Sequence, residues 1–169
     1  MIALHCSAPF KLIRAAAPYF RVKDGEPRNI INISSTSGLH GNAGQANYAL
    51  AKAGVVGLTK TIAKEWGPAF GVRCNTVAFG YIMTRLTAAK ELGSVQVLPD
   101  GTKVALGIPG AQKDARAGGS EPAKQTFPDI PLGRPGNATE AAQAVLAVAS
   151  PLFSYVSGQT ISVTGGRNI

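Results

Sequence analysis

The chain has 169 residues, of which 45% are hydrophobic, and a formal net charge of +8; this length and composition predict one globular domain. Lysine and arginine residues are scattered singly rather than clustered with aromatic residues, which argues against a nucleic-acid partner despite the positive charge. The sequence contains neither a run of about 18 apolar residues nor a signal-peptide pattern at its start, so we expect a cytoplasmic protein without a membrane partner.

The first half of the chain alternates helical and strand patterns. Apolar residues recur at helical spacing over residues 3–20, and Pro9 is expected to kink this helix or to mark where its regular part begins. Residues 29–34 form a β-branched run that is typical of a strand buried on both faces. Residues 35–47, which are rich in serine, glycine and asparagine, are expected to form a loop.

An alanine-rich segment then predicts a long helix over residues 47–66 that ends at Gly67, and a second buried strand is expected over residues 72–78. The order helix, strand, helix, strand is the repeating unit of a parallel sheet covered by helices. The sequence therefore predicts an α/β fold.

The second half is less regular. The long connection over residues 85–127 is expected to be a lid that decides substrate choice, and within it residues 94–106 alternate around a Pro-Asp-Gly turn as a β-hairpin does. A helix over residues 137–149, capped by an asparagine or a threonine, and a short strand over residues 159–163 complete the pattern.

Two cysteines, Cys6 and Cys74, lie far apart, without another cysteine or a histidine at metal-ligand spacing. Both are expected to be reduced, buried thiols, and no metal site is expected. The sequence therefore favours chemistry that needs no metal ion.

The most informative motif is a tyrosine and a lysine four residues apart, Tyr48 and Lys52, within the predicted long helix. This spacing places both side chains on one helical face, one turn apart. An ammonium group favours the phenolate form of a neighbouring phenol and lowers its pKa toward neutrality, so such a pair can deliver or accept a proton. Taken alone, the same spacing is also common by chance on helix surfaces.

Ser35 strengthens the catalytic interpretation, because it stands at the carboxyl end of the predicted 29–34 strand, where ligands bind in open parallel sheets. Its hydroxyl can hydrogen-bond a substrate carbonyl or the alkoxide formed from it. A serine in this place can equally cap the segment that follows, and on the residue alone both interpretations stay open.

The arrangement of Ser35, twelve intervening residues, Tyr48 and Lys52 resembles the active-site signature of the short-chain dehydrogenase/reductase family. Further matches extend the resemblance over nearly the whole chain, and they are most similar to the 3-oxoacyl-acyl-carrier-protein reductase group. These matches are Ile30-Ile-Asn-Ile-Ser-Ser35, Gly44-Gln-Ala-Asn-Tyr-Ala-Leu-Ala-Lys-Ala-Gly54, Val72-Arg-Cys-Asn75, Pro131-Leu-Gly-Arg134 and Ser157-Gly-Gln-Thr-Ile-Ser-Val-Thr-Gly-Gly166.

The resemblance implies an incomplete doubly wound, Rossmann-like sheet and a nicotinamide-dependent oxidoreductase that acts on a ketone, a β-ketoacyl thioester or the corresponding alcohol. It implies that Tyr48 is the general acid/base, that Lys52 lowers the pKa of that phenol, that both contact the cofactor, NADP or NAD, and that Ser35 orients the carbonyl. The residues that it implies for the nicotinamide end of the cofactor are Gly80, Ile82 and Thr84.

The sequence departs from the family pattern at three places. It does not show the glycine-rich turn that cradles the pyrophosphate, so we expect residues 1–169 to be the carboxyl-terminal portion of a single domain, and both NAD and NADP remain candidates. His5 stands where an asparagine commonly completes a proton relay, so either the imidazole serves there as a catalytic group or the relay is lost. Phe79-Gly80 stands in place of Pro-Gly, which removes a backbone restraint beside the nicotinamide pocket.

Without the family's first strands, the 29–34 strand is also expected to be an exposed apolar edge that invites pairing. Two functions follow: an oxidoreductase that works as a homo-oligomer with a cofactor-binding part, or an inactive family remnant that acts only through oligomer contacts. A hydrolase or acyltransferase is disfavoured, because the sequence has no activated-serine motif. Oligomer contacts are suggested by a face of small residues on the long helix, formed by Ala46, Ala49, Ala53, Gly54 and Gly57.

Overall fold

Three parallel strands and three longer helices make up the body of the protein. The computed structural model describes residues 1–84, 87, 95–105 and 127–168. Its parallel strands, which lie in the order β1-β2-β5, are β1 (Arg28–Ser35), β2 (Val72–Phe79) and β5 (Thr160–Val163). Its longer helices are α1 (Ala8–Phe20), α3 (Ala46–Phe70) and α4 (Ala138–Ala149).

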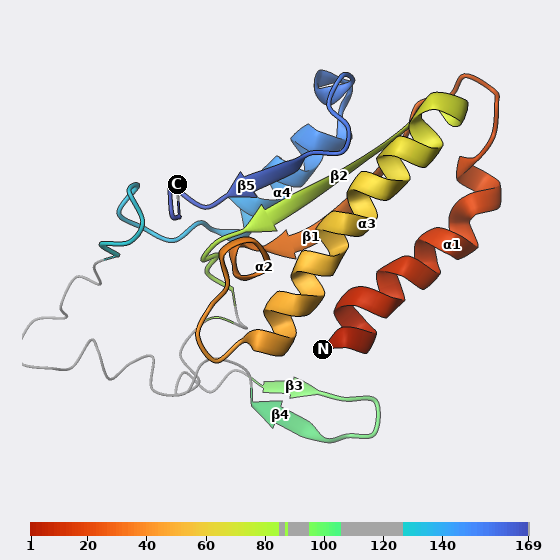
Figure 1. Cartoon of the computed structure of the whole chain (residues 1–169). Helices are drawn as coiled ribbons and strands as arrows, with labels where there is room; N and C mark the ends of the chain where they lie inside the picture. The colour runs from red at the N-terminus through yellow and green to blue at the C-terminus, as the bar shows by residue number, and fades with distance from the viewer. Residues whose placement is uncertain (85–86, 88–94, 106–126, 169) are drawn as a thin grey trace, which may run out of the picture.

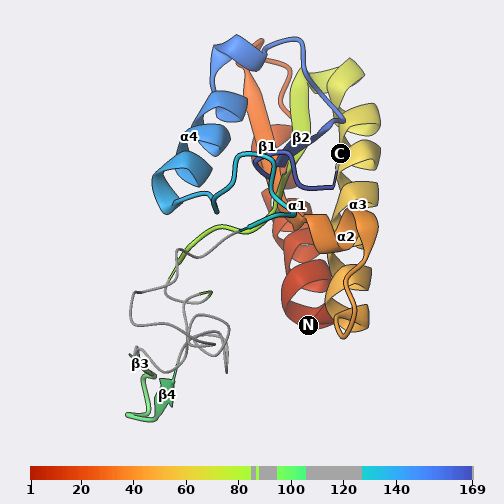
Figure 2. The same cartoon turned by 90° about the vertical axis from the view of Figure 1, so that its left-hand side faces the viewer.

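The helices cover both faces of the sheet. In Figure 1, α1 and α3 lie side by side on one face, and Figure 2 shows α4 on the other face. The predicted α/β fold, with a parallel sheet flanked by helices, is confirmed. The carboxyl ends of β1 and β2 lie together, because Ser35 pairs with Phe79 in their parallel register.

β1 is the strand at one edge of this sheet. Among the described residues it pairs only with β2, along its whole length. Ile33, near its carboxyl end, is 42% exposed. The prediction that this strand is buried on both faces was therefore wrong, whereas the expected exposed apolar edge is present.

Helix α1 begins where Pro9 was expected to mark the start of the regular helix. The proline lies in the first turn, where its missing N–H needs no partner and its fixed φ suits the helix. Before it, Ala3–Ser7 form a π-helical turn. Such turns are rare and frequently lie at functional sites, and this one carries His5.

Helix α3 is longer than predicted. It continues through Gly67 and Pro68, and Gly71 ends it with a left-handed φ of 66° and an N–H that donates to the Gly67 carbonyl at 2.9 Å. The predicted C-cap at Gly67 was wrong, because the left-handed residue that terminates the helix is the next glycine along the chain.

The core lies between the sheet and the helices α1 and α3. Its buried apolar members are Ile13, Ile62, Trp66, Val72 and Cys74. A polar network crosses it at Thr59, whose hydroxyl accepts hydrogen bonds from the Asn32 amide at 2.8 Å and the Thr76 hydroxyl at 2.7 Å. The Thr59 hydroxyl donates in turn to the Val55 carbonyl at 3.0 Å. The network therefore ties α3 to both β1 and β2 inside the core.

The elements of the second half follow the prediction closely. Asn137 caps α4 in a capping box with Glu140, so the cap is the asparagine rather than the threonine. The hairpin is also confirmed, as the antiparallel strands β3 (Val95–Val97) and β4 (Lys103–Ala105). Most of the expected 85–127 lid lies outside the described residues.

Both cysteines are free thiols. Cys74 is fully buried, and burial raises the pKa of its thiol to about 11. Cys6 is only partly buried, so the expectation for it was half right. Among the described residues, no helix is long and apolar enough to cross a bilayer.

Candidate active site

Tyr48 and Lys52 lie one turn apart near the amino end of α3, as their spacing predicts. The Lys52 ammonium nitrogen is 5.7 Å from the centroid of the Tyr48 ring, within the range of cation–π attraction. The lysine is only 8% exposed, and its Nζ donates a 2.9 Å hydrogen bond to the Ile33 carbonyl of β1. Burial disfavours the charged form and lowers the pKa of Lys52. The ammonium is therefore anchored on β1 beside the phenol.

A second serine anchors the same turn of α3. The buried Ser34 donates its hydroxyl hydrogen to the Lys52 carbonyl at 2.8 Å. Sequence reasoning singled out Ser35 and missed Ser34. The signal was the alternation along β1, in which Ser34 shares the face of Asn32 that meets α3.

Ser35 ends β1 and caps the short helix α2 (Thr36–His40). Its Oγ accepts a hydrogen bond from the backbone N–H of Ser37 at 3.2 Å. The segment predicted as a loop over 35–47 therefore begins with a helical turn, because this cap satisfies an amide at the turn's start. The bond uses a lone pair of the hydroxyl and leaves its hydrogen free to donate, so capping and carbonyl orientation are compatible.

Helix α2 packs on α3 at the turn that carries Lys52. A Cβ atom at Gly38 would lie 2.7 Å from both the carbonyl carbon and the Cβ of Lys52. Only glycine permits this approach, since a gap that short between carbon atoms is strongly repulsive. Gly38 thus sets how closely the helix capped by Ser35 approaches Lys52.

Gly38→Ala is expected to destabilise the protein by about 1–3 kcal/mol, because the added methyl group meets main-chain atoms that cannot rotate away. Urea denaturation followed by circular dichroism measures this. Gly57→Ala is the matched control: its Cβ meets no atom within 4 Å, and removing a glycine from a helix interior should stabilise by about 0.5–1 kcal/mol. Equal effects of both substitutions would contradict the close packing of α2 on α3.

His5 reaches the same place from the π-helical turn. Its ring centroid lies 5.5 Å from that of Tyr48, with an interplanar angle of 86°, which is an edge-to-face contact. Burial, followed by the positive charges of Lys52 and the N-terminal amine, lowers the pKa of His5. The imidazole is therefore uncharged at neutral pH, and the structure brings His5, Tyr48 and Lys52 together.

A groove of about 620 Å³, which His5 and Lys52 help to line, runs along the edge of β1. The four consecutive residues Ile30–Ile33 all line it, although neighbouring side chains of a strand face opposite sides, so the groove must follow the strand's open edge. Its remaining lining comes from the helices: Leu4, His5, Ala8, Pro9, Leu12, Ile13, Lys52 and Val55. The candidate site thus opens onto a largely apolar surface.

The residues expected at the nicotinamide end of a cofactor follow β2 at the same end of the sheet. Gly80 comes one residue after Phe79, the register partner of Ser35. A Cβ atom at Gly80 would lie 3.0 Å from the Cα of Thr164, so glycine lets the chain after β2 pass close to the chain after β5. The structure therefore places Gly80 near Ser35 at the carboxyl end of the sheet.

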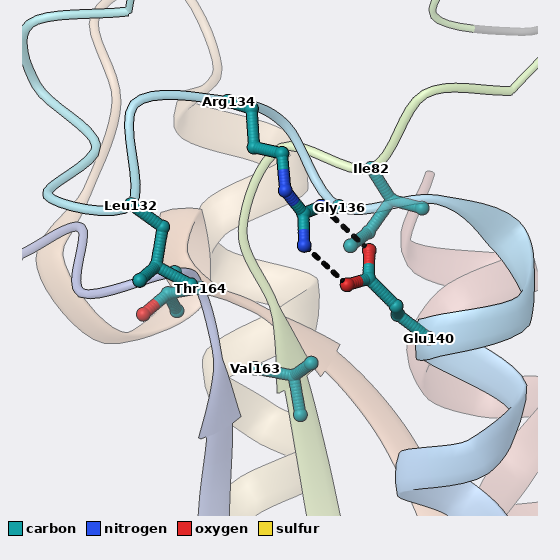
Figure 3. A pocket seen from close by; sticks show the side chains of 8 residues that line it. Ile82, Leu132, Arg134, Gly136, Glu140, Val163 and Thr164 are labelled. Carbon is teal, nitrogen blue, oxygen red and sulfur yellow. Dashed lines mark hydrogen bonds and ion pairs between the residues drawn. The ribbon is translucent and has the colours of Figure 1, made fainter.

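Ile82 and Thr84 make other contacts. Ile82 bridges to Gly136 and lines a cavity of about 130 Å³ (Figure 3). The Thr84 hydroxyl lies 3.2 Å from that of Thr87. Within the described part of the chain, no hydrogen bond links either residue to Tyr48 or Lys52.

The cavity beside Ile82 contains an ion pair that sequence reasoning missed. Arg134 donates two hydrogen bonds to the Glu140 carboxylate, at 2.9 and 2.7 Å (Figure 3). Together with the backbone N–H of Asn137, they lower the pKa of Glu140 to about 2. The signal was the Pro131–Arg134 match directly before the capping box, and the pair fixes that loop on the start of α4.

Comparisons with known proteins agree with one another. A family profile described as enoyl-(acyl carrier protein) reductase matches residues 1–106. A 3-oxoacyl-[acyl-carrier-protein] reductase FabG of Thermotoga maritima is 36% identical over 168 residues, which cover 98% of this chain and 55% of the relative. The (3R)-3-hydroxyacyl-CoA dehydrogenase of Homo sapiens is 37% identical over 166 residues, which cover 98% of this chain and 52% of the relative.

A solved structure is similar over the same extent. A short chain dehydrogenase from Bacillus anthracis matches with a TM-score of 0.68 and 29% identity, over 99% of this chain and 54% of that one. The chain thus spans about half the length of the curated relatives it matches.

Proposed function

Because the chain belongs to the short-chain dehydrogenase/reductase family and is 3-oxoacyl-[acyl-carrier-protein] reductase-like, we propose that its site interconverts a ketone and a secondary alcohol. The substrate class we propose is a β-ketoacyl thioester or its hydroxy form, as the names of the two relatives suggest. The observation that carries the proposal is the pairing of Tyr48 with the buried Lys52 at the end of β1 that Ser35 closes.

Each of the three residues has a distinct role in this proposal. The Tyr48 hydroxyl gives its proton to the carbonyl oxygen during reduction and takes it back during oxidation. The Lys52 ammonium stabilises the phenolate that remains, since it is held close to the ring by its bond to Ile33. Ser35 orients the carbonyl with its free hydroxyl hydrogen.

NADP or NAD, when bound, supplies or accepts the hydride. The donor chemistry of Lys52 fits such a cofactor: an ammonium carries three N–H donors, and the bond to Ile33 uses one of them. The remaining donors suit the hydroxyl groups of a nicotinamide ribose. Tyr48 would contact the same ribose, and the proposal assigns the nicotinamide end to Gly80, Ile82 and Thr84.

The test is to titrate the chain with NADH and NADPH by nucleotide fluorescence and then to follow reduction of an acetoacetyl thioester by nicotinamide absorbance. Lys52→Met is expected to weaken nucleotide binding about ten- to a hundredfold, the loss of a charged hydrogen bond. Lys60→Met changes an exposed lysine of the same helix in the same way and should leave binding unchanged.

The opposite outcome is also informative. A chain that is folded by circular dichroism, sediments as an oligomer and binds neither nucleotide would overturn the proposal. It would favour the alternative, in which the protein acts only through oligomer contacts. That alternative has one supporting observation, because Ala46, Ala53, Gly54 and Gly57 leave an exposed face of small residues on α3.

A further inference from the structure

We propose that His5 is a positioning residue: its imidazole ring holds the Tyr48 ring in the place from which the phenol acts. The inference rests on the proposed role of Tyr48 and adds to it a residue that acts through that ring. It differs from a proton relay, because in this role the imidazole needs its shape and neutrality rather than a transferable proton.

The ring contact is the first support. Aromatic pairs prefer centroid separations of about 4.5–7 Å and edge-to-face angles, and His5 and Tyr48 meet at 5.5 Å and 86°. Lys52 contacts the same ring from the next turn of α3, at 5.7 Å. The Tyr48 ring is thus contacted from two different elements, which restricts its rotation.

The seating of the π-helical turn is the second support. The turn lies against α3, where a Cβ atom at Gly54 would come within 3.2 Å of the Cys6 sulfur. The backbone N–H of His5 donates to the backbone carbonyl of Met1 at 2.9 Å, which stabilises the turn. Cys6 and His5 are neighbours, so the close approach of one to Gly54 fixes how the other faces Tyr48.

The charges around His5 explain why it serves as a neutral ring. Lys52 and Tyr48 face it from α3, the N-terminal amine faces it from the chain start, and Cys6 adjoins it on its own turn. Both charged groups are positive, and with burial they lower the pKa of His5. The folded state therefore binds fewer protons than the unfolded chain, so stability falls as pH drops below about 6.5.

Nuclear magnetic resonance of carbon-labelled histidine tests the surroundings of His5 without any activity assay. The chain has two histidines, and a His40→Gln variant assigns the signals of each. His5 is expected to titrate at lower pH than a histidine in an unfolded peptide, and its midpoint should rise in Lys52→Met. Its ring signals should move in Tyr48→Leu, which removes the neighbouring ring, but not in Tyr48→Phe. A His5 midpoint equal to that of a histidine in an unfolded peptide, and unchanged in Lys52→Met, would overturn the proposal.

Labelled tyrosine tests the positioning itself. In His5→Ala the Tyr48 ring signals are expected to move toward those of the exposed Tyr19, whereas in His5→Phe they should stay near their wild-type positions. In turnover, His5→Ala should lower kcat about ten- to a hundredfold with little change in KM, and His5→Phe should recover most of that loss.

Wild-type turnover is also expected to fall on the acid side with the His5 titration, and His5→Phe should lack that limb. The proposal would be wrong if His5→Ala and His5→Phe lost kcat equally or displaced the Tyr48 signals equally. Failure of the proposed function looks different: no nucleotide binding, although the tyrosine and histidine signals still report the contact.

Discussion

Tyr48→Phe is expected to lower turnover of a β-ketoacyl thioester about a hundred- to ten-thousandfold, the range that a positioned general acid contributes. The substitution removes only the hydroxyl oxygen and keeps the ring that contacts His5 and Lys52. Helix content and stability should therefore stay close to wild type. Nicotinamide absorbance under saturating substrate measures the change in kcat directly.

The matched control is the same change at a tyrosine remote from these contacts. Tyr155 is fully exposed, so Tyr155→Phe should leave kcat unaltered. A Tyr48→Phe protein that turns over at the wild-type rate would remove Tyr48 from the chemistry. A protein that loses turnover together with its fold would instead reveal a structural role for the hydroxyl.

The sequence predicts well those elements whose patterns depend on residues close together in the chain. The apolar runs of β1 and β2 indicate strands wherever they pack, and Asn137 with Glu140 forms a local capping box. The exposure of β1 was harder to predict, because it depends on which strands and helices lie beside the strand. Its composition suits a central strand, whereas its position here is an edge.

The candidate site shows the same division. The spacing of Tyr48 and Lys52 follows from helix geometry and needs no tertiary information. The requirement for glycine at position 38 and the anchoring bond from Ser34 arise only when α2 and β1 meet α3. The π-helical turn behind His5 is also a product of packing, since no local motif in the sequence predicts it. Sequence thus identifies the reactive groups, while the contacts that hold them require the fold.

The largest effect on stability is expected from Asn75→Leu. Asn75 is fully buried in β2; its amide nitrogen donates to the Val156 carbonyl at 2.7 Å, and its Oδ1 accepts from the backbone N–H of Gln159 at 3.0 Å. Leucine keeps the volume but leaves the Gln159 N–H without a partner inside the protein, and the Val156 carbonyl keeps only the 3.3 Å bond from the Arg73 guanidinium. At about 1–3 kcal/mol for the orphaned N–H and about 0.5–1.5 kcal/mol for the lost bond to the carbonyl, the free energy of unfolding should fall by about 1.5–4.5 kcal/mol.

Gln159→Ala is the control for Asn75→Leu, because it also removes a side-chain amide but one that is exposed. Its exposed side chain makes only a 3.4 Å bond to the Ser157 carbonyl, and the substitution keeps the backbone N–H that Asn75 holds. We expect it to change stability by less than about 0.5 kcal/mol in urea denaturation. Comparable losses of unfolding free energy in the two variants would contradict a specific role for the buried Asn75 amide. A loss confined to Asn75→Leu would mean that one buried amide fixes where β5 joins the sheet, and with it the Thr164 turn that Gly80 approaches.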